Sequence, residues 1–486
     1  EISQRPIKLD NPAGFNGELR EFQKEGLAFL MHNRRALLAD SMGLGKTVIA
    51  LSWLAQINQY PVLIVVPPHL VKQWESETKK FLNTVKVEPS ENNILRPDNE
   101  LTYHTITGLT PYSLPKAHIY FIHYLLLRGW KDPFQEMDFK AIVFDEIQEL
   151  RHAGTQKYSV ASLVSEKCEN VIGLSGTPIY NRGGEIWNIL NILEFHCLGD
   201  WESFTREWCY GYGSDTVVDP ELLGKYLKEE GLLLRRTKEE VLSELPPKRR
   251  IVQEIDADEG MYQDLIGKAV EIATEIPDVE DVFLKGRMMR EAVNETRRIT
   301  GIAKAHHVAQ FVKLILEAGE PCLLFAHHHD VVDIYLKELA EYFPGCITGR
   351  ENLKEKDWAV KNFMEERTNL LIISLRAATG LNLPRARAVV FGELDWSPAV
   401  HSQSEDRAHR IGTKDSVLCY YLVCGHGTDA DMMEALGFKI SQFVGIMGDK
   451  EETEAEKLLG KKDTTEFMKN VLEKLRDTKV KAGNKE

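Results

Sequence analysis

The sequence has few cysteines, and none of them form closely spaced pairs. Its seven cysteines include no Cys-x-x-Cys spacing, so the chain offers no zinc-finger or zinc-ribbon framework. Scattered thiols are typical of a protein from a reducing compartment, and we expect no disulfide bonds. Hydrophobic cores must therefore hold the fold together, and 486 residues suffice for roughly two to four domains.

Long apolar runs are also missing. No stretch is long enough to cross a bilayer, and the first residues lack the layout of a signal peptide. We therefore expect an intracellular protein, in the cytoplasm, the nucleoid or the nucleus, without membrane contact.

Positive charge is scarce, because the chain has 60 Lys and Arg residues and 74 Asp and Glu residues, for a net charge of −14. This balance argues against indiscriminate polyanion binding, so any nucleic-acid site must be local.

One segment is typical of a phosphate-binding loop. The apolar run Ala36–Ala39 precedes Asp-Ser-Met-Gly-Leu-Gly-Lys-Thr at residues 40–47, and Val48–Leu51 follows it. This order predicts a strand, a glycine-rich loop and a helix. The standard pattern opens with a glycine, whereas this loop has Asp40 at that position. The segment otherwise predicts a site for a nucleoside triphosphate.

The individual residues of the loop suit that chemistry. Gly43 and Gly45 let backbone N–H groups surround phosphate oxygens, Lys46 reaches the outer phosphates, and the Thr47 hydroxyl can ligate Mg²⁺. Upstream, Gln23 is a candidate for reading adenine, because its amide can both donate and accept hydrogen bonds. Taken alone, Gln23 is equally an ordinary surface glutamine.

Two acids at the end of an apolar run complete the predicted chemistry. The run Ala141–Phe144 is followed by Asp145 and Glu146, which places the carboxylates at a strand tip. Asp145 would hold Mg²⁺, and Glu146 would orient and deprotonate the attacking water. The turn Ser175–Pro178 suits a relay between nucleotide and nucleic acid, or is simply a turn.

The remaining patterns predict two lobes. Up to about residue 195, strand-like runs alternate with helix patterns, which predicts a parallel sheet with right-handed crossovers. The predicted strands of this lobe are 36–39, 62–66, 119–124, 141–144 and 171–174. The turn at Pro67–Trp74 either touches a nucleic-acid backbone or packs its helix through Trp74. Residues 83–115 are expected to be irregular surface chain.

The second half of the chain repeats this organisation. Charged, helix-favouring residues between 196 and 300 predict helical protrusions, with Leu232–Lys238 and Pro246-Pro247 as an interlobe linker. Strands are predicted at 321–326, 370–374 and 388–391. Three consecutive histidines, His327–His329, suggest a metal site, although adjacent side chains diverge and no second ligand cluster is suitably spaced.

A predicted helix near the end of the second lobe carries two arginines. Gln403–Gly412 contains Arg407 and Arg410, three residues apart and hence on one helical face. They could point together at a phosphate held by the other lobe. A solvated basic stripe is the alternative interpretation.

Taken together, these segments resemble the Swi/Snf-type ATPases of helicase superfamily II, over roughly residues 15–435. The residues around Cys322–Val332 and Trp396 resemble the annealing-helicase, fork-remodelling branch. The segments that carry the resemblance are Leu19–Gln23, Asp40–Thr47, Asp145–Gln148, Ser175–Asn181, Leu234–Lys238, Ser374–Leu383 and Gln403–Gly412.

The resemblance implies an α/β fold with two RecA-like parallel-sheet lobes and helical protrusions. We expect the first lobe over residues 1–195, protrusions and linker over 196–300, the second lobe over 301–440 and a charged helical tail over 441–486. It also implies that ATP and Mg²⁺ bind between residues of both lobes. The residues assigned to this site are Gln23, Gly43, Gly45, Lys46, Thr47, Asp145, Glu146, Gly380, Gln403, Arg407 and Arg410.

The activity implied is ATP-driven translocation along duplex or branched DNA, without processive strand separation, and with protein partners for targeting. A conventional DNA or RNA helicase, the motor subunit of a nuclease system and an ATP-gated clamp without turnover are the alternatives. Four departures from the family pattern bear on coupling. Ser41 replaces a usual Glu, Ile147-Gln148 replaces Ala-His, the segment that begins at Ser374 is one residue short, and Thr413 replaces a frequent Gln.

Overall fold

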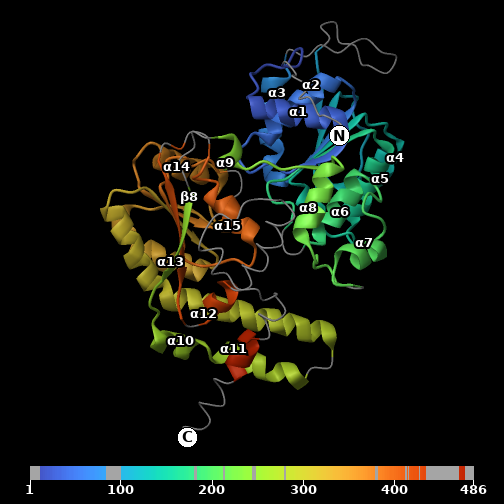
Figure 1. Ribbon diagram of the computed structural model, residues 1–486. Helices are drawn as coiled ribbons and strands as arrows, with labels where there is room; N and C mark the ends of the chain where they lie inside the picture. The colour runs from blue at the N-terminus through green and yellow to red at the C-terminus, as the bar shows by residue number, and fades with distance from the viewer. Residues whose placement is uncertain are drawn as a thin grey trace. The chain divides into compact units, whose positions relative to one another are not determined.

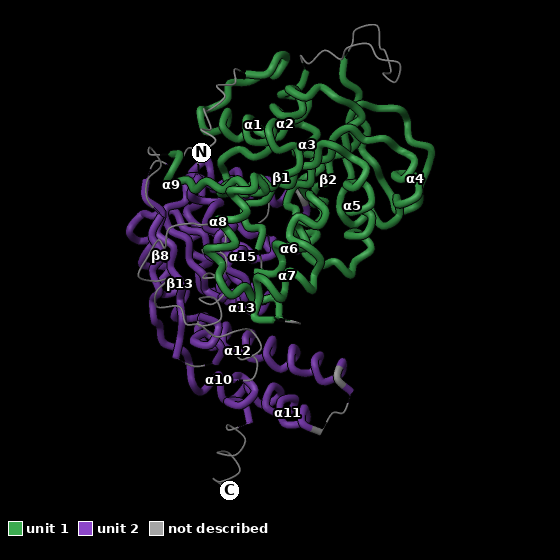
Figure 2. Tube along the Cα trace, turned by 45° about the vertical axis from the view of Figure 1, so that its right-hand side comes forward, with its two compact units in different colours: residues 1–243, 442–450 green, residues 244–441, 451–486 purple. Residues whose placement is uncertain are grey.

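The computed structural model describes residues 11–83, 100–179, 183–211, 214–242, 248–278, 281–377, 381–410, 413, 415–425, 427–433 and 470–476. These residues divide into two compact units (Figure 2). The first takes in the described residues up to Leu242, and the second those from Lys248 onward. Within these ranges no helix has both the length and the apolar character to cross a membrane.

The first unit is a seven-stranded sheet in the order β3-β4-β2-β5-β6-β1-β7. All of its strand pairs are parallel, as expected for near-continuous apolar runs that are buried on both faces. The strands are β1 (Arg35–Leu38), β2 (Val62–Val66), β3 (Tyr103–Thr105), β4 (Ile119–His123), β5 (Ala141–Asp145), β6 (Asn170–Leu174) and β7 (Leu233–Leu234).

Helices cover both faces of this sheet. Along β2, Leu63 and Val65 join one core, whereas Val62, Ile64 and Val66 join the other. The second of these cores lies under α1 (Glu21–Asn33), α2 (Lys46–Ile57) and α3 (Val71–Phe81). The other core packs beneath helices that follow later in the chain (Figure 1). They are α4 (Lys131–Glu136), α5 (Gln156–Lys167), α6 (Glu185–Leu193), α7 (Trp201–Trp208) and α8 (Pro220–Glu229).

Two edge strands of the first sheet were not predicted. Strand β3 lies inside residues 83–115, so the expectation of irregular chain throughout was wrong there. Its three residues are half-buried, and only pairing with β4 makes them a strand. The segment suggested as a linker begins as β7, which pairs with β1 and is followed by the short helix α9 (Lys238–Val241). The two prolines at 246–247 lie outside the described residues.

The second unit is a six-stranded parallel sheet in the order β10-β11-β9-β12-β13-β8. The three strands predicted here are confirmed as β9, β11 and β12, and three more complete the sheet. The bounds are β8 (Lys248–Glu254), β9 (Cys322–Ala326), β10 (Gly345–Ile347), β11 (Leu370–Ser374), β12 (Ala388–Phe391) and β13 (Val417–Val423).

Strand β8 lies in a stretch for which the sequence predicted helices. Four of its seven residues, Lys248–Glu254, are charged, and the strand contains no long apolar run. The strand forms because it pairs in full register with β13, from Lys248 opposite Val417 to Glu254 opposite Val423. β13 is the last strand of this sheet in the chain and lies 169 residues after β8. A partner so far away leaves no pattern near β8 from which a strand could be predicted.

A long helix ties the second unit together. α12 (Val282–Glu317) has 36 residues; its first half joins one core and its second half the other. Together with α11 (Gly267–Glu275) it forms a helical hairpin, visible at the lower edge of Figure 1. The other helices are α10 (Glu259–Leu265), α13 (His329–Glu338), α14 (Leu353–Met364) and α15 (Pro398–Glu405). The predicted α/β fold with two parallel sheets is thus confirmed.

Candidate active site

The glycine-rich loop joins β1 to α2, as predicted. Gly43 and Gly45 have φ values of 85° and 79°, a left-handed backbone that favours glycine over residues with a side chain. Gly45 is also the N-cap of α2 and supplies no side-chain acceptor. The first N–H groups of the helix therefore remain open to an anion. Thr47 lies in this first turn and is half-buried.

Lys46 lies folded across the loop. Its Nζ donates to the backbone oxygen of Asp40 at 2.7 Å and to that of Ser41 at 3.4 Å. Burial lowers the pKa of Lys46, while the carboxylates of Glu146, Asp40 and Asp145 act in the opposite direction. The ammonium group is therefore surrounded by oxygens that a phosphate could replace.

The unusual Asp40 is explained by a buried ion pair. Asp40 is fully buried and accepts from the backbone N–H of Arg236 at 3.1 Å and from its Nε at 3.0 Å. A second contact joins Nη2 to the other carboxylate oxygen. The neighbouring Arg235 donates to the backbone oxygen of Ala39 at 2.6 Å. The segment after β7 thus fixes the start of the phosphate loop, where a glycine would offer no anchor.

Gln23 lies against the same loop. Its Nε2 donates to the backbone oxygen of Leu44 at 3.3 Å, and its Oε1 accepts from the N–H of Arg20 at 3.0 Å. A Cβ added at Gly45 would lie 2.6 Å from Gln23 Nε2, so the glycine allows this close approach. The position next to the loop is established, and adenine reading by Gln23 stays a prediction.

The carboxylate of Asp145 is held at the end of β5. Its Oδ2 accepts from Trp74 Nε1 at 2.7 Å, and its Oδ1 accepts from the N–H of Glu146 at 3.0 Å. Burial, and next the charge of Glu146, raise the pKa of Asp145 to about 7. Trp74 is buried and packs α3 on the sheet, which is one of the two roles predicted for its turn. Its indole N–H also orients the Asp145 carboxylate. No local pattern in the sequence indicates that hydrogen bond.

Glu146 begins a hydrogen-bonded chain that reaches the next strand. Its backbone is left-handed, with φ 51° and ψ 51°, an uncommon conformation for a residue with a side chain. The Glu146 carboxylate accepts from Gln148 Nε2. Gln148 Oε1 in turn accepts from Ser175 Oγ at 2.6 Å, and Ser175 Oγ accepts from the N–H of Thr177 at 3.0 Å.

This chain runs through buried groups, because Gln148, Ser175 and Thr177 are all at most 5% exposed. A position where the family commonly has histidine is thus filled by a glutamine that donates through one end of its amide and accepts through the other. Hydrogen bonds thus connect Glu146 to the turn Ser175–Pro178, and the relay from this turn to nucleic acid stays a prediction.

The residues around the loop suit a divalent cation. Asp145 and Glu146 supply hard oxygen donors at one strand end, and the raised pKa of Asp145 shows that its charge is poorly compensated. Mg²⁺ needs only one or two carboxylates beside phosphate oxygens and water. In the described part of the chain there is no cluster of three or more His, Cys, Asp or Glu side chains. Binding of Mg²⁺ by Thr47 and Asp145 stays a prediction.

In the second unit, one prediction about Arg407 and Arg410 was wrong. Helix α15 ends at Glu405, where the N–H of Asp406 closes the last turn, so the two arginines lie in turns beyond it. They still converge, because both guanidinium groups donate to the backbone oxygen of Leu381, at 3.4 Å and 3.2 Å. Gln403 lies on α15 and is half-buried. Gly380 lies outside the described residues.

A buried carboxylate anchors α15 to the edge of the sheet. Glu405 is fully buried and forms ion pairs with Lys248 at 3.0 Å and Arg250 at 2.9 Å, both from β8. The hydroxyl of Tyr421 donates to it at 2.8 Å. Burial alone would raise the pKa of Glu405, but Arg250 and Lys248 lower it far below its usual value. The sequence did not single out this glutamate, since the pairing of β8 with β13 leaves no local pattern.

Two of the three consecutive histidines, His327 and His328, contact a buried glutamate. Glu393 is buried, and one of its oxygens accepts from the N–H groups of His327 at 2.7 Å and His328 at 2.9 Å. The other oxygen lies 2.7 Å from His328 Nδ1. These contacts hold the end of β9 in place.

The sequence is similar to a SWI/SNF-related chromatin regulator and to a DNA annealing helicase. The chain is 31% identical over 443 residues to a SWI/SNF-related matrix-associated actin-dependent regulator of chromatin subfamily A-like protein 1 from Xenopus tropicalis, covering 88% of this chain and 44% of the relative. It is 28% identical over 482 residues to the human DNA annealing helicase and endonuclease ZRANB3, covering 94% and 43%. The chain thus spans less than half the length of these relatives, and the predicted likeness to annealing helicases is confirmed.

A solved structure is also similar: the Sulfolobus solfataricus SWI2/SNF2 ATPase core in complex with dsDNA, at a TM-score of 0.45 and 21% identity, covering 96% of this chain and 98% of that one. Two domain families match the sequence. The helicase conserved C-terminal domain matches residues 304–412, and the SNF2-related domain matches residues 22–299, more than half of the chain. The chain therefore belongs to the SNF2-related family of helicase-type ATPases.

Proposed function

We propose that this chain hydrolyses ATP with Mg²⁺ and couples the reaction to movement along duplex or branched DNA. One observation carries the proposal: the phosphate loop and the acidic end of β5 lie on either side of the same strand end. Leu174 of β6 pairs with Leu38, at the end of β1 before the loop, and with Asp145 on its other side. The charges of Glu146 and Asp145 accordingly act to raise the pKa of Lys46, against the effect of burial. A cation for the outer phosphates, a metal-binding carboxylate and a base are therefore gathered at one site.

Each residue then has a role in the first unit. The N–H groups between Gly43 and Thr47 bind the phosphates, and Lys46 exchanges its bonds to loop carbonyls for bonds to phosphate oxygens. Mg²⁺, held by Thr47 and Asp145, would supply the charge that stabilises the transferred phosphoryl group. Glu146 accepts the proton of the attacking water.

The second unit contributes the positive charge that such a transition state requires. We assign Arg407 and Arg410 to that task, and Gln403 and Gly380 to nucleotide binding. What supports the assignment is the match to the helicase C-terminal domain and the shared contact of the two arginines with Leu381. An arginine supplied to a phosphoryl group contributes about 10³ to 10⁵ in rate.

The DNA part of the proposal rests on family membership and on the relatives, one of which is named as a DNA annealing helicase. Its test is ATP turnover measured in parallel with duplex DNA, single-stranded DNA, forked DNA and RNA. Stimulation by duplex or forked DNA is the expected result. Stimulation by RNA alone would favour an RNA helicase, and DNA binding without turnover would favour a clamp.

Movement without strand separation needs its own assay. Opening each base-pair step works against stacking of about 1.4 kcal/mol, and a motor that tracks an intact duplex avoids this cost. We therefore expect ATP-dependent displacement of a triplex-forming strand, and little separation of a long blunt duplex. Efficient strand separation without triplex displacement would instead identify a conventional helicase. Copurification with a nuclease would favour the motor subunit of a nuclease system.

A further inference from the structure

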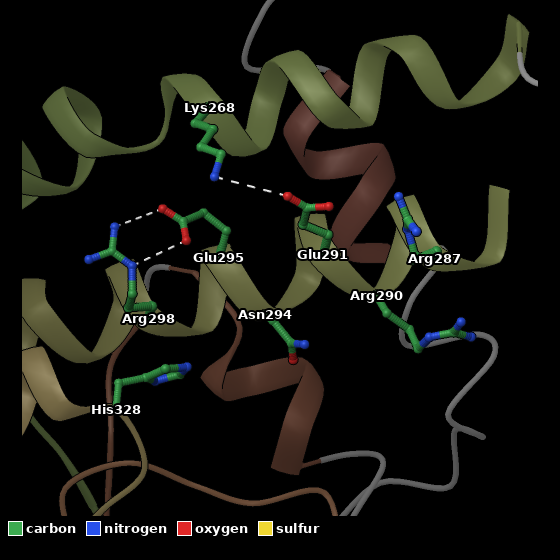
Figure 3. A pocket seen from close by; sticks show the side chains of 8 residues that line it. All are labelled: Lys268, Arg287, Arg290, Glu291, Asn294, Glu295, Arg298 and His328. Atoms are coloured by element: carbon green, nitrogen blue, oxygen red, sulfur yellow. Dashed lines mark hydrogen bonds and ion pairs between the residues drawn. The ribbon is translucent and has the colours of Figure 1, made fainter. Parts of the chain in front are cut away.

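A second charged site lies in the helical hairpin of the second unit. A pocket of about 450 Å³ opens between α11 and α12, close to the end of β9. Figure 3 shows the side chains around it, and we call it the hairpin pocket. Four of its lining residues are cationic, namely Lys268, Arg287, Arg290 and Arg298, and two are acidic, Glu291 and Glu295. It is therefore positive in a chain whose net charge is −14.

The two carboxylates leave part of this charge uncompensated. Arg298 forms ion pairs with Glu295 at 2.7 Å and with Asp330 at 2.6 Å, so its charge is compensated. Lys268 reaches Glu291 only at 4.0 Å, and both side chains are more than half exposed (Figure 3). An exposed ion pair of this length contributes little and exchanges readily with water or another anion.

Arg287 and Arg290 remain available. Both are exposed, and neither has an ion-pair partner among the residues that the structure describes. They lie three residues apart on α12, so they occupy neighbouring positions on one helical face. Two guanidinium groups so placed can each bind a phosphate oxygen through paired N–H donors, which a lysine cannot do.

The pocket continues as a stripe along α12. Phe283, Arg287, Arg290, Asn294 and Arg298 follow at spacings of four, three, four and four residues, the period of one helical face. At 1.5 Å per residue, the stripe from Arg287 to Arg298 is about 16 Å long. Phe283, at the beginning of the helix, is 89% exposed. Two uncompensated arginines, Arg287 and Arg290, with an exposed aromatic ring at one end match the backbone and the bases of a nucleic acid.

The hairpin is held firmly enough to present this stripe. Ala269 and Ala273 of α11 and Ala292 and Val293 of α12 are buried in the core of the unit. From the helical residues 470–476, Arg476 Nε donates to the backbone oxygen of Ala273 at 3.1 Å. The exposed cations therefore project from a packed scaffold, so little ordering entropy is lost on binding.

We propose that the hairpin pocket binds the sugar-phosphate backbone of DNA, as a contact additional to the residues of the ATP site. Arg287 and Arg290 hold the phosphates, Lys268 adds charge, and Phe283 stacks on an unpaired base where the duplex forks. This inference rests on the proposed DNA-dependent function and adds a preference for branched over blunt DNA.

The test uses the full chain and a fluorescent 30-base-pair duplex, blunt or with a single-stranded fork, at several salt concentrations. For Arg287→Glu with Arg290→Glu we expect about tenfold weaker binding or more. The slope of log K against log salt should become shallower by about two, since each phosphate contact contributes about 0.9. Turnover of ATP without DNA should be unchanged. The control, Lys354→Glu with Lys356→Glu on α14, makes the same change of charge elsewhere. It should alter neither the DNA affinity nor the salt slope.

A second variant tests the aromatic residue. Phe283→Ala should weaken fork binding about fivefold or more, as expected for one lost base stack, and leave blunt duplex binding unaltered. Wild-type affinity and salt slope in the arginine variant would overturn the hairpin inference, while the proposed function would stand if wild-type protein binds DNA. Absence of DNA binding by the wild-type protein would overturn both.

Discussion

Arg407 and Arg410 donate hydrogen bonds to the same atom, the backbone oxygen of Leu381, at 3.4 Å and 3.2 Å. The sequence suggested that a helix brings them together. The structure instead ends α15 at Glu405, and the turns that follow fold both side chains onto one carbonyl group. Their proximity therefore depends on a tertiary contact with a distant loop. A shared, weak acceptor is readily exchanged for phosphate oxygens.

The first prediction concerns these arginines. Arg410→Ala and Arg407→Ala should each lower the turnover number by about 10³ or more, with a much smaller change in KM for ATP, because their charge acts mainly on the transition state. Steady-state ATPase kinetics with DNA provide the measurement. Arg367→Ala is a matched control, since that side chain is 63% exposed and pairs with Glu365. Normal turnover in both active-site variants would remove them from the mechanism.

Lys46→Ala should abolish ATP hydrolysis, because the variant lacks the cation that lies folded over the phosphate loop. Binding of DNA should persist, since the loss is confined to the nucleotide site. ATPase activity and DNA affinity are measured on the same preparation. Lys24→Ala, which removes a lysine that forms an ion pair with Glu21 on α1, serves as the control. Retained DNA-stimulated turnover would contradict the assignment of the loop.

Glu146→Gln should preserve binding of ATP and Mg²⁺ and stop turnover, because an amide cannot accept the proton of the attacking water. Nucleotide binding is followed by fluorescence of an ATP analogue, and turnover by release of phosphate. Glu149→Gln is the comparison, because Glu149 is 43% exposed and pairs with Lys157. If nucleotide binding disappears together with turnover, Glu146 has a structural role.

Ser175→Ala should uncouple hydrolysis from DNA. The change removes the hydroxyl that links Gln148 to Thr177. The buried side-chain oxygen of Gln148 then loses this donor, at a cost of about 1–3 kcal/mol. We expect basal ATPase activity to survive and its stimulation by DNA to fall about tenfold or more. Ser165→Ala is a suitable control, because Ser165 is equally buried and its hydroxyl has no hydrogen-bond partner within the described ranges of the chain. Unaltered stimulation by DNA would exclude a relay through Ser175.

Asp40→Ala should destabilise the first unit. It removes the buried carboxylate beside Arg236, which then keeps an ion pair with the exposed Glu25 at 3.5 Å. Loss of the buried partner costs up to about 3–5 kcal/mol, and urea denaturation of the nucleotide-free protein measures the loss. The double variant Asp40→Ala with Arg236→Met should recover part of it, because no unpaired charge remains. Asp138→Ala, at an exposed pair with Lys140, should cost about 1 kcal/mol or less. Equal effects of the two single changes would mean that the buried pair does not stabilise the loop.

Long apolar runs made most of the fold predictable. The predicted strand at 62–66 has the bounds of β2, and those at 370–374 and 388–391 have the bounds of β11 and β12. These strands are buried on both faces, so their residues carry an apolar signal that needs no partner for its interpretation. The phosphate loop and the acids after β5 were predictable for a related reason, because their chemistry requires particular residue types next to a strand.

Edge strands, ion pairs and the position of the arginines were decided by the tertiary structure. β3, β7 and β8 are short or charged, and each is a strand only because another strand pairs with it. Asp40 and Arg236 are 196 residues apart in the chain, and nothing near either one indicates the other.

The sequence by itself therefore determined that a glycine loop with a lysine and a pair of acids each follow a strand, because this information lies in side chains and their nearest neighbours. Their roles toward phosphate, metal and water stay predictions. Only the tertiary structure decided which buried partners fix the site residues: Arg236 for Asp40, Trp74 for Asp145, Gln148 for Glu146 and Leu381 for the two arginines. The physical reason is burial, since a polar group removed from water must find its partner wherever the fold brings one, at any distance along the chain.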